Sequence, residues 1–364
     1  MSQSDPPVTI ETHRQLIDEL DAHIVKLLNE RSLIAVDIGK LKREVDTPIY
    51  AAEREHRVLK RVRELNTGPL PDSCLEAIYR ELMSGSFAVQ QSLRVGYLGP
   101  DGSFSHLAAK QQFGSSIDYV SVETISDVFR AIAAQEINLG LVPIENSIGG
   151  GITETLDGFM ECDVHVCAEV LVAIHHNLLT NDDPEQVKAI CSRPEVFAQC
   201  RRWLADHLRQ AELIAMPSSA KAAEHAANTP HTAAIGSTLA ADIYNLKTAF
   251  SRIEDNPNNV TRFFVIGNQK PKPTGDDKTA LMFSTAHKPG ALAAVLDVLR
   301  DGGINLTHID KRPSQNANWE YCFFADCDGH HENDNLARAL DAAQEHCHNL
   351  TVLGSFPRAD SVPG

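Results

Sequence analysis

The sequence predicts a multidomain protein with an all-α domain over residues 1–92, an α/β domain over residues 93–267 and a smaller α+β domain over residues 279–364. Three observations predict this fold class. Apolar residues recur every three or four positions up to residue 92, short β-branched runs alternate with helical stretches from 93 to 267, and residues 268–278 are rich in proline, glycine and charge. The last composition is typical of a linker, and 364 residues suffice for two or three domains.

Composition excludes several classes of partner. The formal net charge of −16 argues against a nucleic-acid or anionic-membrane surface, because both need clustered Lys and Arg. We see no basic segment followed by an apolar run at the N-terminus, and no stretch approaches the ~18 apolar residues of a membrane span. Eight scattered cysteines without a CxxC pair fit free thiols in a reducing cytoplasm. We therefore expect a cytoplasmic protein that binds no nucleic acid, no membrane and no metal.

The first helix is expected to place positive charge on an apolar face. No proline interrupts residues 9–45, so one long helix should end before Pro48. Arg31 falls seven residues after Ile24, inside the apolar stripe, and Lys42 lies only about 20° further around the helix. The stripe consists of Ile17, Leu20, Ile24, Leu27, Ile34, Ile38 and Leu41. Two cations on such a face are costly unless they are paired or surround an anion.

The next two helical stretches add polar residues to the same region. The apolar face of the third stretch runs on into Ser86 and Gln90, and the second stretch carries Arg54 and Glu55. One interpretation is a helical bundle with buried salt bridges. The other is a site for a small dicarboxylate, in which arginines act as bidentate carboxylate ligands.

Three segments then carry a resemblance to a known family. HRQLIDELDAHIVKLLNERSLIAVDIGKLK, EREH and SGSFAVQQ resemble the all-helical chorismate mutase family over roughly the first ninety residues. The resemblance implies a substrate site made by Arg14, Arg31, Lys42, Arg54, Glu55, Ser86 and Gln90. In it the arginines gather the charged groups, Glu55 holds the hydroxyl, and Ser86 touches a carboxylate. Lys42 and Gln90 donate to the ether oxygen as its bond breaks, so they are the catalytic candidates.

Two features qualify this match. The family often has an aspartate three residues before the middle arginine, and Ala51 occupies that place here, so one expected hydroxyl contact has no counterpart. The resemblance also implies two intertwined chains, with Arg14 reaching the partner's site. We therefore expect a homodimer and leave open whether dimers pair into tetramers. A rearrangement of this kind needs no nucleophile, cofactor or metal, because restraint of the reactive conformer and charge stabilisation suffice.

The central domain contains four segments with candidate binding groups. They are YLGPDGSFSHLAA (97–109), GLVPIENSIGGGITETLDGF (140–159), ICSRPEVFAQC (190–200) and NPNNVTRFFVIG (256–267). In the first, Gly102, Ser103 and Ser105 could offer donors to an anion at a helix start. In the second, Asn146 and Ser147 lead into a glycine-rich turn at 149–151, which can bind an anion but is weak evidence alone. A lone Thr-Arg-Phe is more often an exposed strand start than a site.

Together the four segments resemble prephenate dehydratase over about 175 residues. HHNLL (175–179) and AAIGSTLAADIYNL (233–246) fit the same pattern. The resemblance implies two α/β lobes, similar to periplasmic ligand-binding proteins, with the substrate between them. Thr261 is then the essential catalytic residue for the loss of the ring hydroxyl, with Phe263 behind it packing the ring. The remaining substrate-binding candidates are Ser103, Asn146, Ser147, Gly149 and Arg262, with Asn146, Ser147 and Arg262 expected at the carboxylates.

The C-terminal segment KPGALAAVLDVLRDGGINLTHIDKRPS (288–314) has strands and helices around it in the order β-α-β-β-α-β, which favours a ferredoxin-like unit. It resembles the ACT regulatory domain in its phenylalanine-binding form. The family's Glu-Ser-Arg-Pro element appears as 310–313, altered at its first two positions. The effector residues implied are Gly290, Ala291, Leu292, Asn305, Leu306, Asp310, Arg312 and Pro313. A simple dimerisation module is the alternative.

The three resemblances together imply one bifunctional enzyme of phenylalanine biosynthesis. It would rearrange chorismate to prephenate and convert prephenate to phenylpyruvate, with feedback inhibition by phenylalanine. Two alternatives stay open: a non-catalytic sensor, and a mutase fused to prephenate dehydrogenase. The second would need a GxGxxG dinucleotide fingerprint, and none occurs in the chain, so we expect no cofactor.

Overall fold

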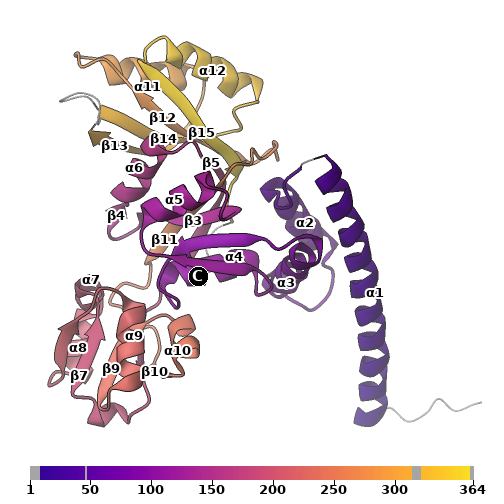
Figure 1. The fold of residues 1–364 in the computed structure, drawn as a ribbon, viewed down its shortest axis with the longest axis vertical. Coiled ribbons are helices and arrows are strands. Elements are labelled where there is room, and N and C mark those ends of the chain that lie inside the picture. Colours follow the sequence, from indigo (N-terminus) through magenta and orange to yellow (C-terminus); the bar gives the residue numbers. More distant parts are fainter. Residues whose placement is uncertain (1–8, 46, 314–320, 361–364) are drawn as a thin grey trace, which may run out of the picture.

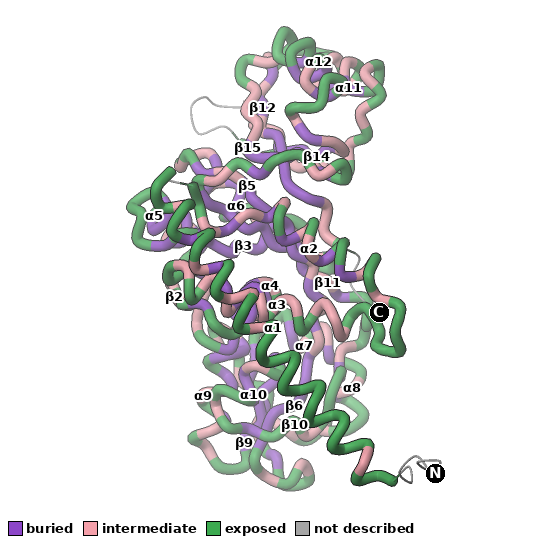
Figure 2. Tube along the Cα trace, turned by 90° about the vertical axis from the view of Figure 1, so that its right-hand side faces the viewer, coloured by how far each residue is buried: buried purple, intermediate pink, exposed green. Residues whose placement is uncertain are grey.

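The computed structural model describes residues 9–45, 47–313 and 321–360 (Figure 1). The outer ends of the predicted first and third domains, 1–8 and 361–364, lie outside the described residues. The chain forms a helical N-terminal part, a central part with two sheets and a C-terminal part with a third sheet. Figure 2 shows the buried residues gathered in the sheets, whereas the first helix is exposed along most of its length.

The N-terminal part consists of α1 (Ile10–Glu44), α2 (Ala52–Leu65) and α3 (Asp72–Gln90). A capping box between Thr9 and Thr12 starts α1. The helix packs on α3 near its C-terminal end, where Ala35 and Gly39 are buried. A Cβ on Gly39 would lie 2.8 Å from Gln90 Cγ, so glycine permits the close approach of the two helices.

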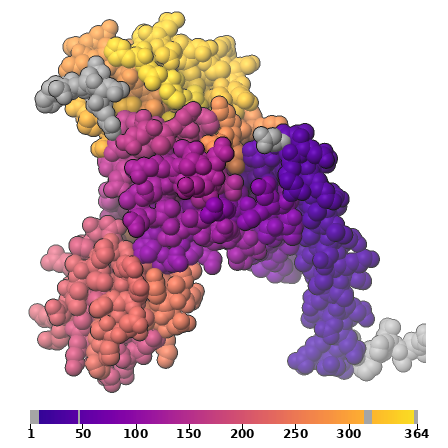
Figure 3. All heavy atoms as spheres, in the orientation of Figure 1, coloured from indigo at the N-terminus to yellow at the C-terminus, as the bar shows by residue number. Residues whose placement is uncertain are grey.

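The predicted long helix is confirmed, but its apolar stripe is uncovered. Leu20, Leu27 and Ile34 are 59%, 62% and 63% exposed. Figure 3 shows the N-terminal half of α1 projecting from the body of the molecule. The described chain therefore buries only the end of this helix, and the rest of the stripe presents a large apolar surface to solvent.

The first central lobe is an α/β unit around a mixed sheet. The sheet order is β2-β1-β3-β11-β5, with β1, β2 and β3 parallel and β11 antiparallel to both of its neighbours. Its strands are β1 (Arg94–Leu98), β2 (Asp118–Val122), β3 (Leu139–Asn146), β4 (Gly150–Gly151), β5 (His165–Ala173) and β11 (Val260–Gly267). The helices α4 (Phe104–Phe113), α5 (Ile125–Ala133) and α6 (Thr153–Glu161) flank the sheet.

Strand β11 is buried on both faces. Phe263 and Val265 pack with Tyr97 and Phe113 on one face. Phe264 packs on the opposite face with Phe129, together with residues of the C-terminal part. Successive side chains of a strand point to opposite faces, so β11 separates two cores.

The second lobe has its own sheet, in the order β10-β6-β9-β7-β8. Its strands are β6 (Asn177–Thr180), β7 (Ala189–Ser192), β8 (Glu212–Ala215), β9 (Thr232–Gly236) and β10 (Lys247–Phe250). A short 3-10 helix, η1 (Pro184–Gln186), precedes β7, and the α-helices are α7 (Pro194–Gln199), α8 (Arg201–His207), α9 (Ser219–Asn228) and α10 (Thr238–Tyr244). The chain enters this lobe between β5 and β6 and leaves it between β10 and β11. We call these segments, residues 174–176 and 251–259, the two crossovers.

The C-terminal part has the predicted β-α-β-β-α-β order. Its elements are β12 (Asp277–Ser284), α11 (Ala291–Asp301), β13 (Leu306–Pro313), β14 (Tyr321–Asp328), α12 (Asp334–Gln344) and β15 (Asn349–Pro357), and the antiparallel sheet runs β13-β14-β12-β15. Strand β12 begins at Asp277, so its first two residues lie within the segment predicted as a linker. Thr274 N and Gly275 N donate to the Asp277 carboxylate and turn the chain into the strand. Phe324 and Phe356 join this sheet to Phe264 of the first lobe.

Candidate active sites

Arg31 and Ser86 form the centre of the helical site. Arg31 Nη1 donates to Ser86 Oγ at 2.7 Å, and Ser86 Oγ donates to Leu82 O at 2.7 Å. The first bond joins α1 to α3, so the predicted cation in the apolar stripe points at the polar end of the third helix. The structure brings these two predicted residues together.

Lys42 lies about three turns beyond Arg31 in α1, and Gln90 lies about one turn beyond Ser86 in α3. Lys42 Nζ donates to the carbonyl oxygens of Pro48 (3.1 Å) and Ile49 (2.7 Å). Burial lowers the pKa of Lys42, and the charge of Glu53 partly offsets this effect. Gln90 Oε1 is buried without a hydrogen-bond partner among the described residues. An unsatisfied buried amide is costly in a purely structural role.

Arg14 and Arg54 stand apart from this cluster. Arg14 lies on the free half of α1, about 25 Å along the helix axis from Arg31. Its side chain is 70% exposed, and Nη1 lies 3.7 Å from Glu11. Arg54 is exposed on α2. Within one chain, Arg14 therefore cannot contact a ligand held by Arg31.

Glu55 is turned toward the central part of the molecule. Its carboxylate is buried and accepts a hydrogen bond from Gln112 Nε2 of α4 at 3.2 Å. Burial raises the pKa of Glu55 to about 7, and Arg80 opposes this shift. Within one chain this bond directs the Glu55 carboxylate toward α4 of the first lobe, and its role in holding a substrate hydroxyl stays a prediction.

This pKa gives a testable dependence of stability on pH. A carboxyl whose pKa rises from 4.5 to about 7 on folding stabilises the fold below pH 4.5 and loses that contribution as the pH rises through 7. The free energy of unfolding of the unaltered protein should therefore fall by roughly 3 kcal/mol from acidic to mildly alkaline pH because of this group. Glu55→Gln should not show this fall. Urea unfolding at both pH values measures it. Glu64→Gln, at an exposed position of the same helix, is the control, and an equal pH slope in both variants would contradict the assignment.

The central site forms around the first residues of β11. Thr261 is in register with Asn146 of β3 on one side and Val172 of β5 on the other. Asn146 Nδ2 donates to Thr261 Oγ1 at 2.9 Å and to Asn259 Oδ1 at 2.8 Å. Because Thr261 Oγ1 accepts this bond, its own hydrogen is free for another acceptor.

The glycine-rich turn fixes Asn146. Asn146 Oδ1 accepts from the backbone N–H groups of Ile148 (3.0 Å) and Gly149 (2.8 Å). Ser147 Oγ accepts from Val260 N at 2.9 Å and donates to Asn258 O at 3.1 Å. The structure therefore brings four of the predicted residues together: Asn146, Ser147, Gly149 and Thr261. The hydroxyl hydrogen of Ser147 is already bonded to Asn258 O of the second crossover.

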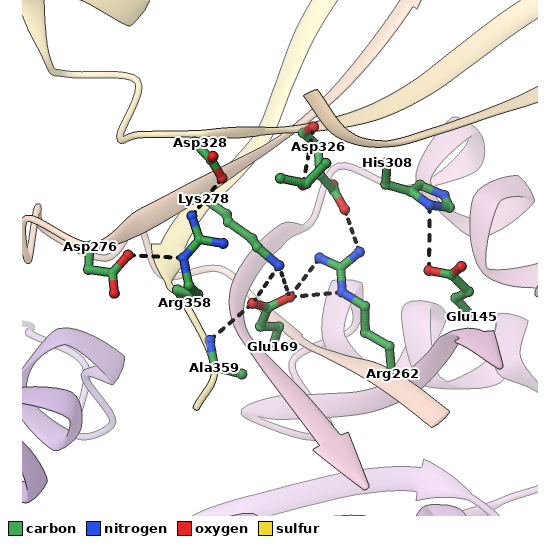
Figure 4. A network of polar contacts seen from close by, with 11 residues as sticks. Glu145, Glu169, Arg262, Asp276, Lys278, His308, Asp326, Asp328, Arg358 and Ala359 are labelled. Atoms are coloured by element: carbon green, nitrogen blue, oxygen red, sulfur yellow. Dashed lines mark hydrogen bonds and ion pairs between the residues drawn. The ribbon is translucent and has the colours of Figure 1, made fainter. Parts of the chain in front are cut away.

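Arg262 of β11 lies between the carboxylates of Glu169 and Asp326 (Figure 4). Its Nε donates to Glu169 Oε2 at 2.8 Å, Nη2 lies 2.7 Å from the same oxygen, and Nη1 pairs with Asp326 of the C-terminal part. The prediction that Arg262 binds a substrate carboxylate is corrected, since strand alternation turns it away from Thr261. Phe263 shares the face of Thr261 but is fully buried in the core.

Ser103 has a structural role at the start of α4. Its Oγ accepts from His106 N (3.2 Å) as the helix N-cap and donates to Leu98 O (2.9 Å). The neighbouring Gly102 contacts the second lobe, where Ser237 Oγ donates to Gly102 O at 2.8 Å. The segment 97–109 therefore contributes to the contact between the lobes. The hydroxyl hydrogen of Ser103 is bonded to Leu98 O and is not free for a substrate.

Three polar residues near Thr261 escaped the sequence prediction. Asn259 Nδ2 lies 3.3 Å from Gln199 Oε1, and His176 Nε2 lies 2.6 Å from the same oxygen. All three belong to segments that carried the resemblance, so their presence there was the available signal. Spacing gave no reason to group them, because 23 and 60 positions separate the hydrogen-bonded pairs.

The predicted effector residues fall into three places. Ala291 and Leu292 line a hollow of about 160 Å³ at the start of α11. Gly290, the residue before this helix, has a φ of +81°. Asn305 and Leu306 line a second hollow of about 350 Å³ at the other end. The helix has 11 residues and is about 16 Å long, so one small ligand cannot span both hollows.

Asp310 and Arg312 point toward the first lobe instead. Arg312 Nε and Nη2 pair with both carboxylate oxygens of Asp157 at 2.8 and 2.5 Å. Asp310 lies over Gly151, where an added Cβ would clash with its carboxylate. The prediction of an effector role for these two residues is corrected, because alternation along β13 places them against the lobe, and Pro313 is exposed at the strand end.

No helix within the described residues is long and apolar enough to cross a bilayer. No three His, Cys, Asp or Glu side chains there are placed to hold a metal ion.

Comparisons with known proteins show which families the chain resembles. The family models Chorismate mutase type II and Prephenate dehydratase match residues 13–91 and 95–271. A bifunctional chorismate mutase/prephenate dehydratase of Stutzerimonas stutzeri is 40% identical over 366 residues, covering 99% of this chain and 100% of that protein. One from Aquifex aeolicus is 39% identical, covering 95% and 97%. The crystal structure of prephenate dehydratase in complex with L-Phe from Arthrobacter aurescens matches 75% of this chain and 92% of its own, with 32% identity and a TM-score of 0.69. This chain belongs to the bifunctional chorismate mutase/prephenate dehydratase family.

Proposed function

We propose that the chain catalyses two consecutive reactions and that phenylalanine slows the second. The helical part rearranges chorismate to prephenate, and the central part converts prephenate to phenylpyruvate. The observation that carries the proposal is the Thr261 hydroxyl, which accepts from Asn146 and so has its hydrogen available for a substrate.

The second reaction needs a proton donor at one position. Prephenate loses its ring hydroxyl as water and its ring carboxylate as carbon dioxide, and the electron pair of the broken C–C bond completes the aromatic ring. Hydroxide is a poor leaving group, so a donor must contact the departing oxygen. Thr261 is a weak acid, and its role is to orient or pass a proton. Its position beside the second crossover supports a substrate site between the lobes, which is the place that the resemblance to prephenate dehydratase implies.

The first reaction needs restraint and charge stabilisation. Arg31, oriented by its bond to Ser86 Oγ, holds a carboxylate, while Lys42 and Gln90 donate to the ether oxygen as negative charge develops on it. The depressed pKa of Lys42 reflects a partly desolvated site, in which such a donor acts more strongly.

A homodimer completes this site. The exposed stripe of α1 is too apolar to remain in water, and a second copy of the helix supplies a matching surface. An antiparallel partner helix also brings its own Arg14 to the far end of this chain's stripe, near Arg31. The same pairing suits the effector site, since the hollows at the two ends of α11 could each contribute half of a phenylalanine site between two ACT-like parts. The L-Phe complex of the Arthrobacter aurescens enzyme supports this effector.

We expect purified protein to form phenylpyruvate from prephenate, as followed by ultraviolet absorbance in alkali, and phenylalanine to lower the rate. Chorismate consumption measures the mutase in the same sample, and sedimentation equilibrium measures the mass. Absence of product from folded protein would reject the dehydratase and favour a non-catalytic sensor. Rates unaffected by phenylalanine would reject the regulatory proposal, and a mass equal to one chain would reject the dimer.

A further inference from the structure

A line of side-chain hydrogen bonds runs from Thr261 to a buried histidine. Asn146 Nδ2 contacts Thr261 Oγ1 and Asn259 Oδ1, and Asn259 Nδ2 lies 3.3 Å from Gln199 Oε1. The same Gln199 oxygen lies 2.6 Å from Nε2 of His176, which is 1% exposed in the first crossover. Five side chains from both lobes and both crossovers therefore form one connected group.

The atoms fix the direction of each bond. Gln199 Oε1 is a carbonyl oxygen, so both of its neighbours must donate, and His176 must carry its hydrogen on Nε2. A neutral imidazole then has a bare Nδ1, and His176 Nδ1 is buried with no hydrogen-bond partner in the described part of the chain. Burial lowers the pKa of His176, which favours the neutral ring.

The orientation of two carboxamides depends on this histidine. Backbone N–H groups already fix Asn146. Among the described residues, Gln199 and Asn259 receive no such bonds from backbone N–H groups, and a carboxamide can rotate to exchange its oxygen and nitrogen. If Gln199 turned, its NH₂ group would face the NH₂ group of Asn259. If Asn259 then turned, it would present a donor to the donor of Asn146 and disturb the contact to Thr261.

We propose that His176 is a positioning residue of the dehydratase. Its Nε2–H holds Gln199 and Asn259 in the orientation that leaves the Thr261 hydroxyl hydrogen directed to the substrate. The same bonds hold the second lobe, through Gln199 of α7, at a set position relative to that hydroxyl. This inference rests on the proposed dehydratase activity, because a positioned hydroxyl matters only if Thr261 takes part in the reaction.

The test compares His176→Leu with His176→Gln in the full-length protein. Leucine fills similar space without a donor, and we expect kcat for prephenate to fall about tenfold or more, with KM changed less than about threefold. Glutamine restores an N–H donor toward Gln199 and should recover most of the turnover. Chorismate consumption should be unchanged in both. His175→Gln is the matched control, since that neighbouring ring pairs with Glu254 at 2.8 Å.

Full turnover in His176→Leu, or equal loss in both variants, would overturn the proposal. If the unaltered protein formed no phenylpyruvate, the proposed function would fail instead. If the leucine variant folds poorly, a measurement on the unaltered protein tests the proposal without it. In spectra of ¹⁵N-histidine-labelled protein, the signal absent from His176→Gln should show a hydrogen on Nε2 and a bare Nδ1 at neutral pH. A hydrogen on Nδ1, alone or in a charged ring, would also overturn the proposal.

Discussion

Thr261→Ala should lower dehydratase turnover about 10²–10⁴-fold, the usual contribution of a positioned proton donor, and leave the mutase rate unchanged. The hydroxyl oxygen of Thr261 is held by Asn146 Nδ2 at 2.9 Å, so its hydrogen is the one donor that the group can offer. Alanine removes the donor and the oxygen together. The mutase candidates Arg31 and Ser86 belong to α1 and α3, which the substitution does not touch.

Two further variants separate chemistry from packing. Thr261→Ser keeps the hydroxyl and should retain turnover within about tenfold of the unaltered enzyme, while Thr261→Val keeps the volume and should resemble alanine. Phenylpyruvate formation at saturating prephenate is the measurement, with chorismate consumption as the internal control. Unchanged turnover in the alanine variant would refute the role of Thr261.

Arg262→Met should lower the free energy of unfolding by about 3–5 kcal/mol, because it removes the cation between two buried carboxylates. Glu169 and Asp326 are both buried, and Arg262 contacts each of them. Lys278 Nζ, 3.0 Å from Glu169, compensates one carboxylate in part. The group joins the first lobe to the C-terminal sheet (Figure 4), so the loss should be accompanied by easier separation of the two parts.

Arg358→Met is the matched control. Arg358 pairs with Asp276 and Asp328 at the partly exposed edge of the same group, where ion pairs contribute about 0–1 kcal/mol. Urea unfolding of both variants, with hydrogen exchange of β14, measures the difference. An equal and small effect of both substitutions would contradict the buried-pair argument. A large rise in KM for prephenate without loss of stability would restore Arg262 to the substrate site.

The sequence predicts the parts of this molecule that depend on local pattern. Uninterrupted spacing from residue 9 to 45 predicts α1, and the glycines after Asn146 predict a turn with backbone N–H groups available to an acceptor, which is the Asn146 side chain itself rather than the expected anion. These features depend on neighbours a few positions away. Arg31 and Ser86 could also be paired in advance, since each interrupts an apolar helix face.

Orientation across a doubly buried strand could not be predicted in the same way. Phe263 and Phe264 are both buried, so β11 shows no alternation that identifies the face of the site. The place of Arg262 beside Thr261 in the sequence therefore predicts a substrate contact that the structure does not show. The contact made by Arg312 could not be predicted for a related reason. Its partner Asp157 lies 155 positions earlier, and only the docking of the C-terminal part on the first lobe brings the two side chains together.

The alternation along β11 also limits how the length of the chain can change. A shift of this strand by one residue relative to β3 would exchange Thr261 and Arg262, placing a charged guanidinium beside Asn146 and a small hydroxyl between Glu169 and Asp326. Both sites would fail in one event. Insertions and deletions in this region must therefore be absorbed by the exposed part of the second crossover, residues 255–258, so that the register of the strand is kept.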